Sequence, residues 1–360
     1  MDSYDYDLPA GRIAQQPLEE RDSSRLLHYR PGGLIEDRIF SELPGLLAPD
    51  DLLVINDVKV RQARLRANLD TGGQAELLVL AAVGKATYEC MTRPARKLRT
   101  GSRLRLRDGT AAEVMQSLDE IRPGLRVVAF ETENPDQLFA MVGETPLPPY
   151  IRSSADGERY QTVYATGSPS ASAAPTAGFH FTQSVLTTLA ENEIRIARIQ
   201  LEVGLGTFAP IAASDLREHS IHTEHYTLPP ETAGAIARTR KQNGRVVAVG
   251  TTVLRVLESC ATAGRLVVPR RGSTSLFIRP GYRVQVADAL LTNFHQPRSS
   301  LLVLLATYMA DTDQLAQGNG SAGPGRLEPW RLAYEHALEE GYRFLSFGDC
   351  MLCYRGSLHQ

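Results

Sequence analysis

The sequence predicts an α/β protein, in which a smaller antiparallel β-barrel is inserted into a discontinuous α/β/α domain. Three observations favour this fold class. An apolar run at residues 51–55 ends at turn-forming residues, short β-type runs follow between residues 62 and 143, and strand and helix patterns alternate after residue 144. Such alternation is typical of a mostly parallel sheet covered by helices. We therefore expect one domain over residues 1–61 and 144–360, and an inserted domain over residues 62–143.

Length and composition agree with a globular protein of two domains. The chain has 360 residues, of which 42% are hydrophobic and 22% are charged, close to the averages of folded proteins. Its 41 acidic and 39 basic side chains leave a formal charge of −2, so a nucleic acid would have to bind a local patch. The acidic start does not resemble a secretory signal, and the apolar run at residues 301–306 is too short to cross a bilayer. We expect a cytoplasmic protein with no membrane partner.

The segment expected to form the barrel has β-type runs at residues 76–80, 102–107 and 126–130. Turn signals such as Asp108-Gly109 separate them, and short strands at regular spacing are typical of a small barrel or sandwich. Residues 93–107 contain seven basic side chains and no acidic one, which favours contact with phosphate over a merely solvated strand face. These residues are Arg93, Arg96, Lys97, Arg99, Arg103, Arg105 and Arg107.

Strand and helix patterns alternate through the rest of the chain. A loop of small residues occupies 156–177, and Thr182 is a good N-cap for the helix that follows. The expected helices cover residues 182–192, 231–242, 251–263, 298–310 and 329–340. The expected strands cover residues 194–203, 245–250, 275–278, 283–286 and 343–347. A linker rich in Gly, Ser and Ala is expected at residues 317–325.

The run from Pro175 to Thr182 joins this loop to a helix start. It contains Thr176, Gly178 and His180. Small residues can bring backbone amides to a ligand, and histidine is the usual acid or base near neutral pH. The alternative is a buried histidine at a loop-to-helix joint, and the local sequence favours neither reading.

Two further glycine-containing runs follow expected strands. Gly250-Thr251-Thr252 lies at a helix start with Arg255 one turn further on, which suits an anionic group such as a carboxylate. An N-cap without a ligand is the alternative. Gly206 and Thr207 follow the expected strand at 194–203. Glycine there could let the backbone approach a ligand closely, but a simple tight turn is the favoured interpretation.

The run from Thr292 to Ser300 is polar and contains Asn293 and His295. These side chains could recognise the edge of a base or move a proton, or they could serve in capping and packing.

Two other patterns are weaker. His219, His222 and His225 repeat at a spacing of three, but a zinc site would usually need ligands from a second segment, so we expect no metal. Cys350 and Cys353 follow an expected strand rather than preceding a helix, and a redox role is not favoured.

Taken in order, many segments resemble one family, the S-adenosylmethionine:tRNA ribosyltransferase-isomerases of queuosine biosynthesis. The most diagnostic is Ala173-Ala-Pro-Thr-Ala-Gly-Phe-His-Phe181, and the similarity extends from the N-terminus to about Leu352. The similar segments are residues 5–9, 13–15, 21–27, 53–56, 63–65, 146–151, 159–165, 173–181, 206–208, 249–252, 255, 257–259, 277–282, 291–295, 342–344 and 348–349.

The resemblance implies the same fold and a reaction. Family members transfer the ribosyl group of S-adenosylmethionine to the aminomethyl group of 7-aminomethyl-7-deazaguanine at a tRNA wobble position. The sugar is isomerised, which gives epoxyqueuosine, and adenine and methionine leave. S-adenosylmethionine is consumed, so no resident cofactor and no metal is implied, and the family suggests a monomer.

Such chemistry needs a base for the sugar proton beside the sulfonium, an acid for the departing adenine, and groups that hold the methionyl carboxylate. We predict acid–base roles for His180 and His295. The remaining candidates for substrate binding are Thr176, Gly178, Gly206, Thr207, Thr251, Thr252, Arg255 and Asn293. The candidates for tRNA binding are Arg93, Arg96, Lys97 and Arg99.

The chain departs from the family pattern at a few positions. Glu202 replaces a usual His, Lys59 a usual Arg, and Arg61-Gln62 a usual Ile-Pro, while Phe179 replaces a Leu before His180. The first change exchanges a near-neutral titratable group for a carboxylate. Two rival functions therefore stay open, a paralogue that acts on another amine and a tRNA-binding module without catalysis. Release of adenine would separate the enzymes from the module.

Overall fold

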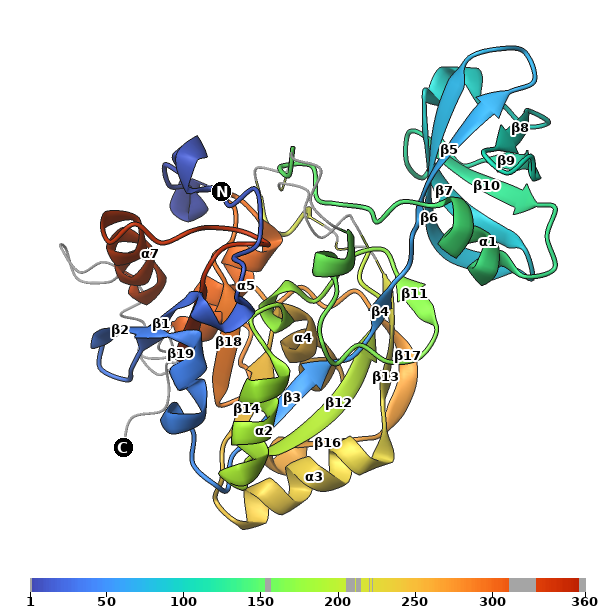
Figure 1. The fold of residues 1–360 in the computed structure, drawn as a ribbon. Helices are drawn as coiled ribbons and strands as arrows, with labels where there is room; N and C mark the ends of the chain where they lie inside the picture. Colours follow the sequence, from blue (N-terminus) through green and yellow to red (C-terminus); the bar gives the residue numbers. More distant parts are fainter. Residues whose placement is uncertain are drawn as a thin grey trace. The chain divides into compact units, whose positions relative to one another are not determined.

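The structure is a computed structural model in which the chain forms two compact units (Figure 1). It describes residues 2–152, 157–204, 211, 215–219, 221, 223–310 and 328–355. The larger unit is Met1–Asp57, Pro148–Ala165 and Pro175–Gln360, and the smaller is Val58–Leu147 and Thr166–Ala174. The fold class is the predicted one, an α/β domain interrupted by a smaller barrel. Segment 166–174 belongs to the smaller unit because β11 (Pro169–Ala171) pairs with β4 (Lys59–Val60).

A nine-stranded sheet forms the centre of the larger unit, in the order β17-β13-β12-β3-β14-β18-β19-β1-β2. Its central strands β12, β3, β14 and β18 are parallel, whereas β18–β19 and both outer pairs are antiparallel. The sheet is therefore mixed rather than mostly parallel. In the same order the strands are Arg270–Thr274, Glu224–Leu228, Arg195–Leu201, Leu52–Asn56, Val246–Val249, Ala289–Asn293, Cys350–Tyr354, Arg25–Tyr29 and Ile35–Ile39.

Three expected strands are wrong. Residues 283–286 do not join a ladder because the amides of Gln285 and Val286 donate to the buried Glu258 carboxylate, at 2.9 and 2.8 Å. Residues 343–347 form a turn instead, in which the Arg343 amide donates to Asp349 at 2.8 Å. The strand expected at 275–278 lies earlier, as β17. The strands actually present beside these segments are β18 and β19.

The five expected helices form, although the third ends early, at Ser259. They are α2 (Gln183–Glu191), α3 (Pro230–Lys241), α4 (Thr251–Ser259), α5 (Ser300–Met309) and α7 (Pro329–Glu339). Thr182 caps α2 as predicted, accepting the Val185 amide at 3.2 Å. Residues beyond α4 pair as β15 (Ala261–Thr262) and β16 (Leu266–Val267).

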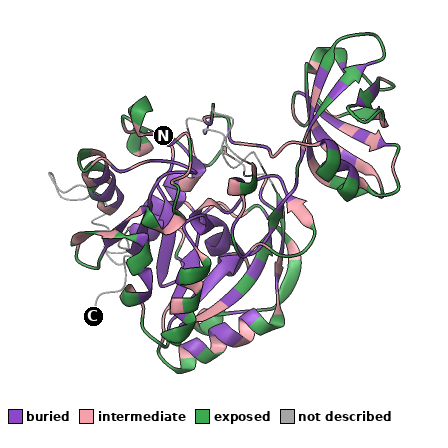
Figure 2. Cartoon of the chain, viewed as in Figure 1, coloured by how far each residue is buried: buried purple, intermediate pink, exposed green. Residues whose placement is uncertain are grey.

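The sheet carries the core of this unit, and its strands β3, β14 and β18 are buried along their length (Figure 2). Leu53, Ile55 and Leu291 pack with α2 and the short helix η4 (Phe40–Leu46) in one cluster. Their neighbours Val54 and Leu290 are also fully buried, and successive residues of a strand face opposite sides. Both faces are therefore covered, which leaves the strand ends as the place for a site.

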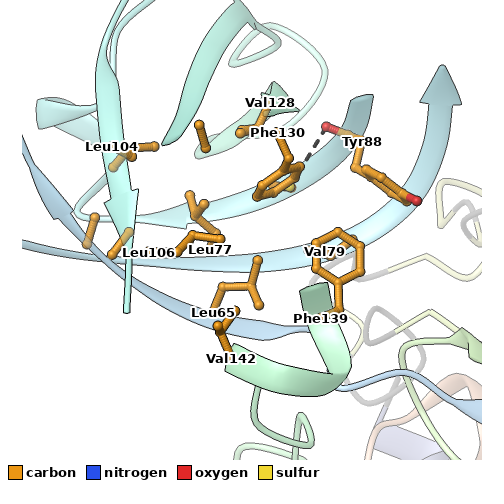
Figure 3. Close-up of a cluster of buried hydrophobic side chains, with 14 of the residues drawn as sticks. Leu65, Leu77, Val79, Tyr88, Leu104, Leu106, Val128, Phe130, Phe139 and Val142 are labelled. Carbon is orange, nitrogen blue, oxygen red and sulfur yellow. Dashed lines mark hydrogen bonds between the residues drawn. The ribbon is translucent and has the colours of Figure 1, made fainter. Parts of the chain in front are cut away.

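The smaller unit is a closed antiparallel barrel in the order β10-β7-β6-β5-β8-β9. Helix α1 (Pro135–Val142) contributes Phe139 to its core, where the rings of Tyr88 and Phe130 lie 5.1 and 5.2 Å from that of Phe139 (Figure 3). The barrel strands, in the order just given, are Leu125–Phe130, Thr87–Arg93, Gln74–Gly84, Arg64–Leu69, Arg103–Leu106 and Ala111–Ser117.

Replacement of Phe139 tests the importance of α1 to the barrel. The ring is fully buried, so Phe139→Ala should lower the opening free energy of the barrel amides by about 3–5 kcal/mol. Hydrogen exchange of the intact chain measures that free energy. Met141 on the same helix is 65% exposed, and Met141→Ala should change the free energy by less than about 0.5 kcal/mol. Equal effects of the two substitutions would contradict the packing described.

Candidate active site

Polar side chains gather at the edge of the sheet where β3, β14 and β18 end. Strand β19 runs antiparallel to β18, with Cys350 opposite Asn293, and β1 runs parallel to β19, with Leu26 opposite Cys350. The starts of β19 and β1 therefore lie at the edge where β18 ends. This arrangement brings Ser24, Asn293 and Asp349 to one place. Open α/β sheets bind ligands at such an edge.

A chain of hydrogen bonds connects these segments through His180, which is 3% exposed. The Asn293 amide donates to Nε2 of His180 at 3.2 Å, so Nδ1 carries the proton and donates to Ser24 Oγ at 2.7 Å. The Asn293 carbonyl in turn accepts from Thr176 Oγ1 at 3.0 Å. Thr176, Asn293 and His180 are thus held in one network.

His180 is neutral in this network at physiological pH. Burial, followed by the charges of Arg21 and Arg343, lowers the pKa of His180 to about 3. A neutral ring with both nitrogens bonded orients the Asn293 amide. Proton transfer by His180 would first require one of these two bonds to break.

His295 is held differently. Its Nε2 lies 3.0 Å from Thr292 Oγ1, and its backbone is fixed by the hydroxyls of Tyr334 and Tyr6, at 2.8 and 2.5 Å. Burial lowers the pKa of His295 to about 3. Within the described residues only Nε2 of this ring is hydrogen-bonded, so Nδ1 is available to a ligand.

Two small pockets flank the network. One, of about 30 Å³, is lined by Thr176, Asn293 and His295 together with Tyr150 and Ser346. The other, of about 20 Å³, is lined by His180, Ser24 and Arg21, and it shares Ser346 with the first. Three of the predicted residues therefore face one cavity, while His180 faces its neighbour.

The start of α4 lies beside this network. Gly250, with φ +93°, turns the chain from β14 into α4, and a Cβ at this position would lie 3.4 Å from Thr252 Oγ1 and 3.6 Å from Ala177 Cβ. Thr252 Oγ1 is buried and has no hydrogen-bond partner among the described residues. The first amides of a helix have no partner within the helix. Together these donors form a place where an anion would be stabilised.

The positive charge of Arg255 is balanced by a carboxylate, so it adds no free charge at the start of α4. It forms an ion pair with Glu224, and both side chains are 3% exposed. Its Nε donates to the Leu276 carbonyl at 3.2 Å, and Glu224 accepts the Gly204 amide at 3.1 Å. The pair therefore fixes the start of the segment after β12. Gly206 and Thr207 belong to that segment and lie outside the described residues.

Gly178 has a steric role. A Cβ there would overlap the Tyr164 hydroxyl and would lie 2.7 Å from Thr162 Cγ2. Only glycine allows this close approach, which places the 176–180 segment against residues 162–164.

The seven basic residues at positions 93–107 fall into two groups. All seven are exposed, but Arg103, Arg105 and Arg107 lie 3.7, 3.6 and 3.5 Å from Glu113, Asp70 and Glu144. The other four form no ion pair with any described residue. They flank or occupy a 3₁₀ turn, Ala95–Lys97, and we call residues 93–99 the basic turn. Its cations are Arg93, Arg96, Lys97 and Arg99.

The departures from the family pattern lie in distinct environments. Glu202 and Lys59 are exposed. Arg61 is 9% exposed and lies over the rings of Tyr88 and Phe139, at 5.4 and 5.8 Å from their centres. The barrel core thus accounts for Arg61 in place of an apolar residue.

The weaker patterns carry no site in the part of the chain that the structure describes. No group of three or more His, Cys, Asp or Glu side chains there is arranged to hold a metal, and His222 lies outside it. Cys350 and Cys353 are buried, free thiols within β19. No described helix is both long and apolar enough to span a membrane.

Sequence reasoning did not single out Ser24, Tyr150 and Ser346 individually. Ser24 bonds His180, and the Tyr150 hydroxyl lies 2.6 Å from Ser346 Oγ between the walls of the first pocket. The only available signal was that Ser24 and Tyr150 fall within segments shared with the family.

These features define an enzyme class, an α/β catalytic domain with a polar pocket at its strand ends and an accessory barrel. The sequence matches the queuosine biosynthesis protein family over residues 1–353. The chain therefore belongs to this family, that of the S-adenosylmethionine:tRNA ribosyltransferase-isomerases.

Relatives of that name match nearly the full length of the chain. The protein from Thiobacillus denitrificans is 43% identical over 99% of this chain and 97% of its own length. The protein from Rubrobacter xylanophilus is 46% identical over 99% and 98%. The crystal structure of S-adenosylmethionine tRNA ribosyltransferase from Thermotoga maritima is similar, with a TM-score of 0.51, 31% identity, and coverage of 97% of this chain and 99% of that one.

The buried histidines make the stability of the larger unit pH-dependent. Because the pKa of His180 is lowered to about 3 in the folded state and is about 6.5 in an unfolded chain, the unfolded state binds more protons between these values. The free energy of unfolding should therefore rise with pH, by about 1.4 kcal/mol per pH unit for this group, and be fully present above pH ~6.5.

The test is urea unfolding at pH 4.5 and 5.5, followed by the fluorescence of Trp330, the single tryptophan of the sequence. His180→Gln should reduce the difference between the two pH values by about 1.4 kcal/mol. An unchanged difference would show that His180 is not held neutral by the fold.

Proposed function

We propose that this protein transfers the ribosyl group of S-adenosylmethionine to 7-aminomethyl-7-deazaguanine at the wobble position of tRNA and isomerises it to epoxyqueuosine, with release of adenine and methionine. The observation that carries this proposal is the match over nearly the whole chain to relatives named for that transfer. The polar network at the sheet edge supports it, because both leaving groups and the sugar need directed hydrogen bonds.

The start of α4 is our candidate for the methionyl carboxylate. Thr252 has a buried hydroxyl without a partner among the described residues, and the helix start offers free amides and a positive end to the helix dipole. Arg255 acts at a distance, because its charge is balanced by Glu224. Its contribution is to hold α4 and, through Glu224, the Gly204 amide. Gly206 and Thr207, which lie outside the described residues, stay candidates for contact with the substrate.

His295 is our candidate for proton transfer at the first pocket, because its ring lines the cavity and one nitrogen is free for a ligand. We propose that His180 acts through Asn293. Its bond to the amide nitrogen leaves the Asn293 carbonyl facing Thr176, so this amide has a fixed orientation toward the edge of a base. Protonation of His180 would break that arrangement.

The basic turn is our candidate for the tRNA backbone. Its four exposed cations form no ion pair among the described residues, and unpaired cations on a rigid turn are suited to phosphate. We also propose that the protein works as a monomer and without a resident cofactor, since S-adenosylmethionine is itself consumed.

One assay tests the reaction. Protein, S-adenosylmethionine and tRNA bearing 7-aminomethyl-7-deazaguanine are incubated, adenine is followed by chromatography, and the tRNA is digested for nucleoside masses. We expect adenine together with epoxyqueuosine. Adenine with a different tRNA product would indicate another amine acceptor, and absence of both products with tRNA still bound would indicate a binding module.

Thr252→Val tests the carboxylate site. The substitution keeps the shape and removes the hydroxyl, so the KM for S-adenosylmethionine should rise about tenfold, which corresponds to about 1.5 kcal/mol for one hydrogen bond to a charged group. Thr187→Val on the exposed side of α2 is the matched control and should leave that KM unchanged. An equal KM for the Thr252 variant and the control would exclude Thr252 from the site.

A further inference from the structure

A buried arginine lies directly beneath the basic turn. Arg126, on β10, is 3% exposed, although its neighbours along the strand are largely apolar. Its Nε donates to the Leu98 carbonyl at 2.7 Å and its Nη2 donates to the Ala95 carbonyl at 3.1 Å. Two bonds from one rigid guanidinium therefore fix the two ends of the 95–98 segment.

The charge of Arg126 is balanced from the neighbouring loop. Its Nη1 donates to the Asp119 carboxylate and to the Leu125 carbonyl, at 2.7 and 2.8 Å. The same oxygen of Asp119 accepts the Gly124 amide at 2.7 Å, and the Arg126 guanidinium holds the pKa of Asp119 well below its usual range. A buried guanidinium is tolerated only with such partners.

Gly124 extends the support to the other side of the turn. Its carbonyl accepts the Thr92 amide and hydroxyl at 2.9 and 3.0 Å. A Cβ on Gly124, which has φ +86°, would lie 3.5 Å from Ala95 Cβ. Arg126 thus bonds the basic turn directly and Gly124 lies next to Ala95, while Asp119 acts on the turn through Arg126 and Gly124. The cations of the turn are exposed.

We propose that Arg126 and Asp119 are positioning residues that hold the basic turn in the shape that binds RNA phosphate. The inference rests on the proposed function of this turn in binding tRNA. Inward-facing carbonyls leave the side chains of Arg96 and Lys97 exposed and without acidic partners among the described residues. Arg103, Arg105 and Arg107, in contrast, already face Glu113, Asp70 and Glu144. The guanidinium therefore sets which cations are available to phosphate.

A double-mutant cycle on the full-length chain tests this coupling, with unmodified tRNA transcript as the probe and its Kd measured at several salt concentrations. Arg96→Gln/Lys97→Gln should weaken binding and reduce the log–log salt slope by about 1 for each phosphate that the variant no longer neutralises. Asp119→Ala removes the partner of Arg126 and should weaken binding about three- to tenfold, with a similarly reduced slope. Combined with Arg96→Gln/Lys97→Gln, it should add little, because the two changes act on the same part of the tRNA interface.

Further variants separate positioning from simple loss of stability. Arg126→Lys keeps the charge but cannot bond both carbonyls, so it should weaken tRNA binding as Asp119→Ala does, and Asp119→Glu should restore most of the affinity. None of these changes should alter the KM for S-adenosylmethionine. Arg105→Gln, which removes a cation already facing Asp70, is the matched control and should have a smaller effect on the Kd. If Arg126→Lys does not fold, the positioning role is tested with Asp119→Ala alone.

The outcomes distinguish this inference from the proposed function. If Arg96→Gln/Lys97→Gln binds tRNA with full affinity, the basic turn is not part of the tRNA interface. The positioning role of Arg126 and Asp119 would then be wrong as well. Weakened binding in that variant, with unchanged affinity or an unchanged salt slope in Asp119→Ala, would overturn the positioning role alone. Additive effects in the combined variant would overturn it as well, since independent sites add.

Discussion

The antiparallel pairing of β19 with β18 decides which residues can reach the candidate site. Asn293 ends β18 opposite the first residue of β19, and β1 follows β19 in parallel. If β19 ran the other way, its end at Tyr354 would lie beside Asn293, and Asp349 and Ser24 would lie at the opposite edge. The bond from His180 to Ser24 could not form, and the Asn293 amide would lose the Asp349 carbonyl, which accepts from it at 3.4 Å.

The two units use buried arginines in the same way. Arg255 in the larger unit and Arg126 in the barrel are each balanced by one carboxylate. Arg126 donates to the carbonyls of Leu98, Ala95 and Leu125, and Arg255 donates to that of Leu276, while Nη2 of Arg255 has no partner among the described residues. Burying a guanidinium is costly, and the cost is offset only when the geometry satisfies its donors. In the larger unit the result is a fixed start to the segment after β12, and in the barrel it is a fixed 95–98 segment. Residue type reveals the charge of Arg255, for which the sequence predicts binding of an anionic group, but it does not reveal the Glu224 partner.

Local signals predicted the elements that local forces determine. The apolar run at 51–55, the Thr182 cap and the Gly250 turn each depend on residues close in sequence, and the structure has β3, α2 and α4 there. Strands β1 and β19 were missed; they pair with each other across more than 300 residues, and in addition β1 pairs with β2 and β19 with β18. The segment 343–347 looks like a strand in isolation, but the Asp349 carboxylate takes the Arg343 amide and turns the chain.

The residues of the candidate site also divide into those with a local sequence signal and those brought in by the fold. Thr176, Asn293 and His295 could be named as candidates from their residue types and motifs, and they line one pocket. Their neighbours Ser24, Tyr150 and Ser346 come from three distant segments with no distinctive pattern. Likewise, the seven cations at 93–107 look equivalent in sequence. Only the fold brings Asp70, Glu113 and Glu144 to three of them.

The parallel pairing of β1 with β19 also has a consequence for how the chain matures on the ribosome. At roughly 5–20 residues per second, β1 emerges on the order of tens of seconds before β19 exists. The barrel strands are all made in the meantime from one stretch, and they close on each other without help from either terminus. The sheet edge that carries the candidate site is therefore completed only after residues 349–354 have been translated.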